Sequence, residues 1–199
     1  MRFRIRALIL TLAVVPAALA YEYPLSETTI REAYFRGSGP KGTETDFYTR
    51  YIHNLPIPRT APPVSYISLD TPYLQIAEHS RDTANYDAQD AVREFLNKPL
   101  RLRVFTEVYY RPKQRDPSGE GSHDIKVRLV QHDREVSTEV ADRWDLNTFR
   151  DAATSEESVG QHVELTCSAD KVDSSPLTVE VDTPDGQHAE TTFDLDEIK

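Results

Sequence analysis

Carboxylates are the side chains of this sequence that are most often placed where they could do chemistry. Four aspartates lie in or beside predicted turns of the last third of the chain: Asp170, Asp173, Asp182 and Asp185. Calcium prefers six to eight oxygen ligands, and loops at the end of a β-sandwich can assemble them without the spacing of an EF-hand. The same acidic residues could hold the carboxylate pair of a glycosidase. The sequence leaves open a calcium site, a hydrolase and a solvated acidic surface.

Histidine, serine and cysteine chemistry has weaker support. The histidines His132, His162 and His188 are predicted to project outward from strands, but none has a local zinc-ligand spacing. Residues 168–171 fit the S-x-x-K pattern of penicillin-binding enzymes, yet they follow a strand and lack the S-D-N and K-T-G partners. Cys167 is the single cysteine, and its alternation with polar residues predicts a buried, inert thiol. We expect no catalytic residue and, calcium apart, no cofactor.

Aromatic and basic residues are the candidates for binding a partner. Tyr21 and Tyr23, if exposed, could stack on a sugar or on another protein, although docking of the helices explains most aromatics in this region. A basic patch is predicted on the outward face of two strands expected to be neighbours. Its residues are Arg101, Arg103, Lys126 and Arg128. The patch could face an anionic glycan, the acidic region of another copy, or solvent.

The first 20 residues read as an export signal. Three arginines precede an apolar run from Ala7 to Val15, and Ala18-Leu19-Ala20 forms a cleavage site. The run is too short to span a bilayer, which needs about 20 residues, and no later stretch approaches that length. Residue 21 is Tyr rather than Cys, which argues against a lipid anchor. We therefore expect a periplasmic or extracellular protein cleaved after Ala20.

The charge of the chain is negative and unevenly distributed. The formal net charge is −10, and loss of the three signal arginines would make it more negative still. From Asp133 to Lys199 there are 18 acidic and 5 basic residues. Such a surface repels nucleic acid and anionic lipid, and it favours cations or a basic partner. Nucleic-acid binding is excluded as a primary role.

The segment from residue 21 to residue 99 is predicted to be rich in helices. Ser26 can cap the first helix and Gly37 can end it, while Asp87 can cap the last, whose buried stripe includes Phe95 and Leu96. The first two helices are expected to form a helical hairpin. The predicted elements are helices over 27–36 and 46–54, a strand over 64–70, and helices over 73–81 and 87–97.

The segment from residue 100 to residue 199 is predicted to be an antiparallel β-sandwich. Apolar residues alternate with polar ones in several short stretches separated by turn signals, most clearly in a hairpin from Pro176 to Leu195. Strands over 100–110 and 124–132 are expected to pair, which would set Glu107 opposite Lys126 or Arg128. The remaining elements are a loop over 112–123, a weak strand within 135–144, a loop or short helix over 145–160, and a strand over 161–167.

Three segments carry a resemblance to known proteins. They are YEYPLSETTIREAYFRG (21–37), YIHNLPIP (51–58) and PLTVEVDTPDG (176–186). These segments resemble parts of a group of exported bacterial proteins of uncharacterised function. The resemblance implies export and a bacterial source, and it brings no activity or site residue.

Together these patterns predict a mainly β protein, an immunoglobulin-like or C2-like sandwich preceded by short helices. The function expected from them is a non-catalytic binding or structural module of the bacterial cell envelope, with an envelope protein or a glycan as partner. Two alternatives stay open: a secreted hydrolase that uses carboxylates or a metal in the loops at the ends of the sandwich, and a calcium-stabilised interaction module.

Overall fold

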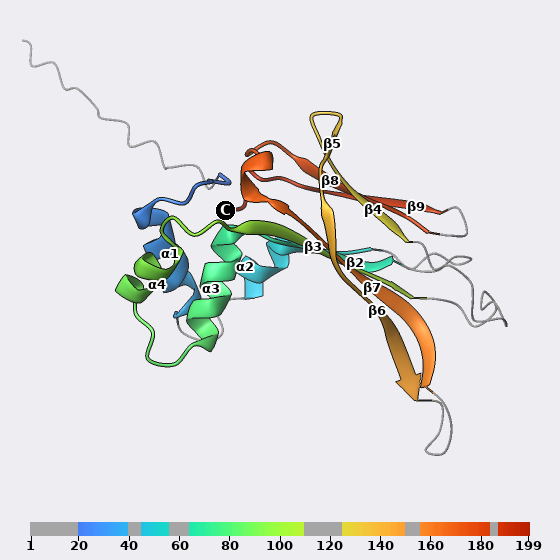
Figure 1. Ribbon diagram of the computed structural model, residues 1–199, viewed down its shortest axis with the longest axis horizontal. Helices are drawn as coiled ribbons and strands as arrows, with labels where there is room; N and C mark the ends of the chain where they lie inside the picture. Colours follow the sequence, from blue (N-terminus) through green and yellow to red (C-terminus); the bar gives the residue numbers. More distant parts are fainter. Residues whose placement is uncertain (1–19, 40–44, 56–63, 110–124, 150–155, 184–186) are drawn as a thin grey trace, which may run out of the picture.

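The computed structural model describes residues 20–39, 45–55, 64–109, 125–149, 156–183 and 187–199. Helices gather at one end of the molecule, and two β-sheets extend away from them (Figure 1). Residues 1–19 of the predicted export signal, the predicted loop over 112–123, and Asp185 lie outside the described residues. The export signal therefore stays a prediction.

Three helices begin at capping residues that the sequence supplies. The side chain of Ser26 accepts a hydrogen bond from the Thr29 N–H at the start of α1 (Glu27–Gly37). Thr71 caps α3 (Pro72–Asp82) in the same way, and proline occupies its first turn, where no N–H is needed. Asp87 and Asp90 form a capping box at α4 (Ala88–Phe95). Three of the four predicted helices are thereby confirmed.

These helices pack against one another through a small apolar core of their own. Its buried residues include Ile30 and Ala33 of α1, Ile76 of α3, and Phe95 of α4. Gly37 lies so close to α3 that an added Cβ would sit 1.8 Å from the Ala77 carbonyl oxygen. Leu96, which was predicted to be buried with Phe95, is exposed because α4 ends one residue before it.

The second predicted helix is only partly correct. Residues 45–48 form the short α2 (Thr45–Tyr48), the 3-10 helix η1 (Thr49–Tyr51) follows, and the chain then extends into β1 (Ile52–Asn54). Strand β1 pairs with the edge of β2 (Val64–Asp70), which was predicted as a strand. The hydrogen bonds of this pairing replace those of a continued helix, so the expected helical hairpin does not form.

The larger sheet contains five strands in the order β1-β2-β3-β7-β6. It is completed by β3 (Arg101–Tyr109), β6 (Glu139–Phe149) and β7 (Glu156–Ser168). Strand β3 buries Leu102, Val104, Thr106 and Val108 on one face, as the alternation predicts. Residues 145–149 and 156–160, predicted as loop or helix, are strand, and β7 has 13 residues against 9 in β3.

The smaller sheet contains four strands in the order β5-β4-β8-β9. They are β4 (Lys126–Gln131), β5 (Arg134–Val136), β8 (Leu177–Asp182) and β9 (His188–Phe193), and the 3-10 helix η3 (Ala169–Lys171) connects the sheets. The predicted terminal hairpin is confirmed, with Leu177 paired to Phe193. The predicted pairing of β3 with β4 is wrong: β3 lies between β2 and β7, and β4 lies between β5 and β8.

Apolar side chains of both sheets form one core. Leu102, Val104 and Leu165 of the larger sheet share it with Val179 and Phe193 of the smaller one. Burial of these side chains provides the main driving force for folding, at about 25 cal/mol per Å² of apolar surface. The coarse prediction of helices followed by antiparallel sheets in a mainly β chain is confirmed.

Candidate binding site

The outer face of the five-stranded sheet is the face turned away from the shared core. Its pairing register aligns four side chains across four adjacent strands. Tyr66 of β2 is opposite Glu107 of β3, which is opposite His162 of β7, which is opposite Trp144 of β6. Directly opposed residues on one face of a sheet have Cβ atoms about 5 Å apart, so these four side chains form a continuous row. We call it the aromatic row.

Glu107 is held in place by two tyrosines. The hydroxyl of Tyr66 donates to Glu107 Oε1 at 3.1 Å, and the hydroxyl of Tyr109 donates to Oε2 at 3.1 Å. Burial and the neighbouring Glu107 raise the pKa of Tyr66 to about 12, so its hydroxyl stays a donor at neutral pH. Both carboxylate oxygens therefore have fixed positions, and each keeps further lone pairs for another donor.

Trp144 and His162 form the other half of the aromatic row. Their rings are stacked, with centroids 3.7 Å apart and an angle of 13° between the planes. Trp144 covers His162, which is only 5% exposed, and Trp144 itself is 44% exposed. His162 lies on the outward face of its strand, as predicted, but it is buried rather than solvated, because the pairing of β6 with β7 brings the indole over it. The exposed indole offers an apolar surface to a ligand.

A cleft of about 220 Å³ lies nearer the helices, on the same face of the sheet. Its residues are Tyr48, Tyr51, Ile52, Ser68, Leu69, Asp70, Leu74, Glu78, Arg103 and Phe105. Arg103 Nε donates to Asp70 Oδ2 at 2.7 Å, whereas the buried Oδ1 atom has no hydrogen-bond partner. Asp70 is therefore an incompletely hydrogen-bonded, buried carboxyl group at the wall of the cleft.

Two carboxyl groups of the cleft titrate abnormally. Burial raises the pKa of Asp70 to about 7, against the opposing effect of Arg103, and Glu78 adds to the increase. Burial also raises the pKa of Glu78. Carboxyl groups of this kind, lining a cleft, are frequent at functional sites.

The cleft and the aromatic row belong to one surface. Strand β3 carries Arg103 at the cleft, Phe105 between the two, and Glu107 in the aromatic row. Four residues of strand separate Arg103 from Glu107, which corresponds to about 13 Å. The surface is therefore long enough for an extended ligand, and it offers aromatic rings together with fixed hydrogen-bond acceptors.

The basic residues predicted as a patch do not form one. Arg101 and Arg103 lie on the outer face of the larger sheet, whereas Lys126 and Arg128 lie on β4 of the smaller sheet. Each arginine also has an acidic partner, at Glu139 for Arg101, Asp70 for Arg103, and Glu180 and Asp182 for Arg128. The predicted patch is wrong because β3 and β4 are in different sheets, but Arg103 is part of the site.

The tyrosines predicted for binding are structural. Tyr21 is buried and donates a hydrogen bond to the Ala169 carbonyl oxygen at 2.8 Å, so the interpretation as an exposed stacking residue is wrong. Tyr23 is half-buried, and its hydroxyl accepts a hydrogen bond from the Leu100 N–H at 3.3 Å. Both residues attach the N-terminal segment to the rest of the fold.

The described aspartates of the predicted calcium site are separated by strand β8. Asp173 precedes β8 and binds His132 at 2.8 Å, while Asp182 ends β8 and binds His188 at 2.8 Å. Asp170 lies in η3. Among the described residues, only Glu180, His188 and Glu190 gather in a group of three that could hold a metal ion. None of the predicted aspartates belongs to this group, and Asp182 is engaged by His188 and Arg128.

Cys167 is buried as predicted, and burial raises the pKa of its thiol to about 11. In the described part of the chain, no helix combines the length and the apolar character needed to cross a bilayer. Neither observation adds a reactive group to the site.

Sequence reasoning found the outward direction of Glu107 and Tyr109 but not their partners. Tyr66 and Trp144 were not predicted as site residues, because each is the only aromatic residue of its predicted strand. The presence of the chain's single tryptophan in a predicted strand was the one available signal. The order of the strands, which brings these residues together, is not encoded in local periodicity.

Comparisons with protein-family models, with curated proteins and with solved structures find no match to this chain. The assignment of a function therefore depends on the geometry described above.

Proposed function

We propose that this protein is a non-catalytic binding module of the bacterial cell envelope, and that it binds a neutral glycan on the outer face of the five-stranded sheet. The observation that carries the proposal is the aromatic row, in which a carboxylate fixed by two tyrosines and an exposed indole lie on the same face of the sheet, with His162 between them. The predicted export signal supports the envelope as the location.

The chemistry of the surface suits a sugar. A pyranose ring presents an apolar face of C–H groups that packs on an indole, and hydroxyl groups that donate to carboxylate oxygens. Trp144 supplies the first contact and Glu107 the second. Phe105 extends the apolar surface to the cleft, where Asp70 and Glu78 supply further carboxyl groups.

The charges of the surface favour a neutral glycan over an anionic one. Glu78, Asp70 and Glu107 are acidic, and Arg103 is already paired with Asp70. The chain as a whole carries a formal charge of −10. A uronic acid or a sulfated sugar would meet net repulsion at this face.

A second function is favoured by Asp70. A carboxyl group with a pKa near 7 is suited to general acid catalysis, and Glu78 lines the same cleft. This supports the alternative of a carboxylate-dependent hydrolase. Release of new reducing ends from a bound glycan would identify the hydrolase, and binding without release would identify the binding module.

We also propose a more specific type for the fold. Two antiparallel sheets around one core support a β-sandwich of the immunoglobulin-like or C2-like kind. Such scaffolds host many functions, so the type of sandwich alone carries no argument about the ligand.

Affinity electrophoresis in gels that contain a neutral polysaccharide, followed by calorimetry with oligosaccharides, tests the proposal. Trp144→Ala and Glu107→Gln should each weaken binding by roughly tenfold or more, since each removes an interaction of about 1–3 kcal/mol. Phe35→Ala is the matched control, because Phe35 is an exposed aromatic residue of α1 away from the sheet. Equal retardation of the wild type and Trp144→Ala, or binding of anionic polysaccharides alone, would contradict the proposal.

A further inference from the structure

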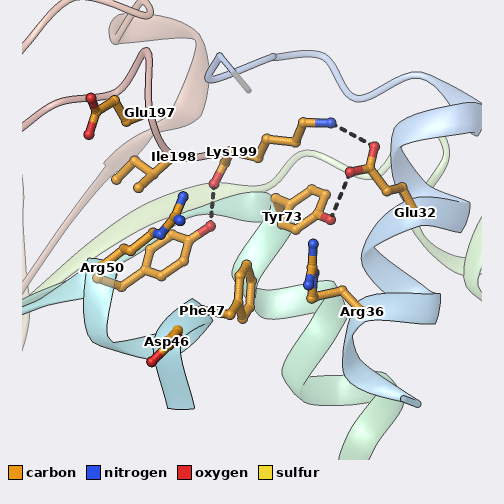
Figure 2. A pocket seen from close by; sticks show the side chains of 10 residues that line it. Glu32, Arg36, Asp46, Phe47, Arg50, Tyr73, Glu197, Ile198 and Lys199 are labelled. Atoms are coloured by element: carbon orange, nitrogen blue, oxygen red, sulfur yellow. Dashed lines mark hydrogen bonds and ion pairs between the residues drawn. The ribbon is translucent and has the colours of Figure 1, made fainter. Parts of the chain in front are cut away.

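A second cavity, of about 170 Å³, lies between the helices and the last residues of the chain (Figure 2). Helices α1, α2, η1 and α3 contribute to it together with residues 197–199. Its residues are Glu32, Arg36, Asp46, Phe47, Arg50, Tyr51, Tyr73, Glu197, Ile198 and Lys199. Tyr51 lines this cavity and also the cleft at Asp70, so the two neighbour each other.

Aromatic rings form an apolar wall of this cavity. Phe47 makes edge-to-face contacts with Tyr51 and Tyr73, at centroid distances of 5.3 and 6.1 Å. The hydroxyl of Tyr51 donates to the main-chain oxygen of Lys199 at 3.0 Å, which fixes this ring. Such a wall can pack against a flat apolar ligand.

Lys199 and Glu32 form an ion pair within the cavity. The Lys199 ammonium group binds Glu32 Oε2 at 2.6 Å, and the Tyr73 hydroxyl donates to Oε1 at 3.4 Å. Figure 2 shows these contacts on one side of the cavity. Both oxygens of Glu32 are therefore engaged by groups other than the guanidinium groups nearby.

Two guanidinium groups of the cavity, those of Arg36 and Arg50, have no carboxylate partner in the part of the chain that the structure describes. Among the described residues, neither Arg36 nor Arg50 has a carboxylate within ion-pair distance. Arg36 lies over the ring of Phe47, with its guanidinium carbon 5.3 Å from the centroid. Figure 2 shows the carboxylates of Asp46 and Glu197 at separate margins of the cavity, away from Arg36. In the described part of this acidic protein, two guanidinium groups thus lie beside an aromatic wall without carboxylate partners.

We propose that this cavity binds a small organic anion, a carboxylate carried on a flat apolar ring. A guanidinium group donates two parallel hydrogen bonds to a carboxylate, which makes Arg36 and Arg50 suitable for the charged end. The wall around Phe47 takes the ring. A volume of about 170 Å³ limits the ligand to one ring with a short substituent. This site neighbours the glycan surface at Tyr51, but its proposal depends on Arg36 and Arg50, which do not line the cleft at Asp70.

Isothermal titration calorimetry of the full chain with benzoate tests the proposal, with benzamide and inorganic phosphate as comparison probes. We expect benzoate to bind with a Kd on the order of 1 mM, as befits a ligand of this size. Benzamide lacks the charge and phosphate lacks the ring, so each should bind roughly tenfold more weakly or not at all. Added salt should weaken benzoate binding.

Arg36→Gln and Arg50→Gln should each weaken benzoate binding by roughly tenfold. Both residues are exposed, so the substitutions should leave the folded state intact, and circular dichroism checks this. Arg93→Gln is the matched control, because Arg93 is an exposed helical arginine of α4 outside the cavity. Absence of benzoate binding at a concentration of about 10 mM, roughly ten times the expected Kd, would overturn the proposal. Unchanged binding in both arginine variants, or equal binding of phosphate, would overturn it as well.

Discussion

Replacement of Asp70 by asparagine should change the pH dependence of folding in a defined direction. Asp70 is 5% exposed, and burial raises the pKa of its carboxyl group from 3.8 to about 7. The folded protein therefore keeps this proton to a higher pH than the unfolded chain does. As the pH rises through the interval from about 4 to 7, the unfolded chain releases the proton first, so the free energy of unfolding falls.

The size of the effect follows from the two pKa values. A shift from 3.8 to about 7 corresponds to ~4 kcal/mol over the whole interval, at 1.36 kcal/mol per unit. Between pH 5 and pH 8 the wild type should lose ~2.5 kcal/mol through this group. The asparagine side chain cannot titrate, so the Asp70→Asn variant should be spared this loss.

Urea denaturation of both proteins at pH 5 and pH 8 measures the prediction. The stability of Asp70→Asn relative to the wild type should increase by ~2.5 kcal/mol between the two pH values. Titrating groups that are not coupled to Asp70, such as His53, whose pKa is lowered by burial, affect both proteins equally and cancel in the difference. A difference that stays constant with pH, or that changes in the opposite direction, would refute the assignment of a raised pKa to Asp70.

Two further predictions concern the core. Gly37→Ala should destabilise the protein by about 2 kcal/mol or more, because the new Cβ would sit 1.8 Å from the Ala77 carbonyl oxygen. Gly39→Ala should be tolerated, and thermal denaturation of the two variants compares their stabilities. The buried Cys167 thiol should react with a thiol reagent only after denaturation, since burial raises its pKa to about 11; rapid reaction of the folded protein would show that this strand opens.

Much of the local structure was predictable from the sequence. Ser26 and Asp87 cap the helices that they were predicted to cap, because capping depends only on residues a few positions apart. The hairpin of β8 and β9 forms as its alternation indicates. The end of the second helix was not predictable, since β1 leaves the helix for hydrogen bonds to a strand more than ten residues away.

The candidate site was much less predictable. Of the residues singled out for binding, only Arg103 lines the cleft, and its partner Asp70 comes from another strand. The predicted basic patch does not form, because the two strands that were expected to pair belong to different sheets. Trp144 and His162 are 18 residues apart in the sequence, and only the pairing of β6 with β7 stacks their rings.

The sequence by itself determined which residues of β3, β4, β8 and β9 face the core, where α1 and α4 begin, and that the protein is acidic. These properties depend on neighbours within a few residues, on alternation, or on composition. Only the tertiary structure decided which strands are adjacent, and hence that Glu107 lies among Tyr66, Tyr109 and His162. Strand order depends on long-range packing of two sheets on a common core, for which a local pattern holds no information.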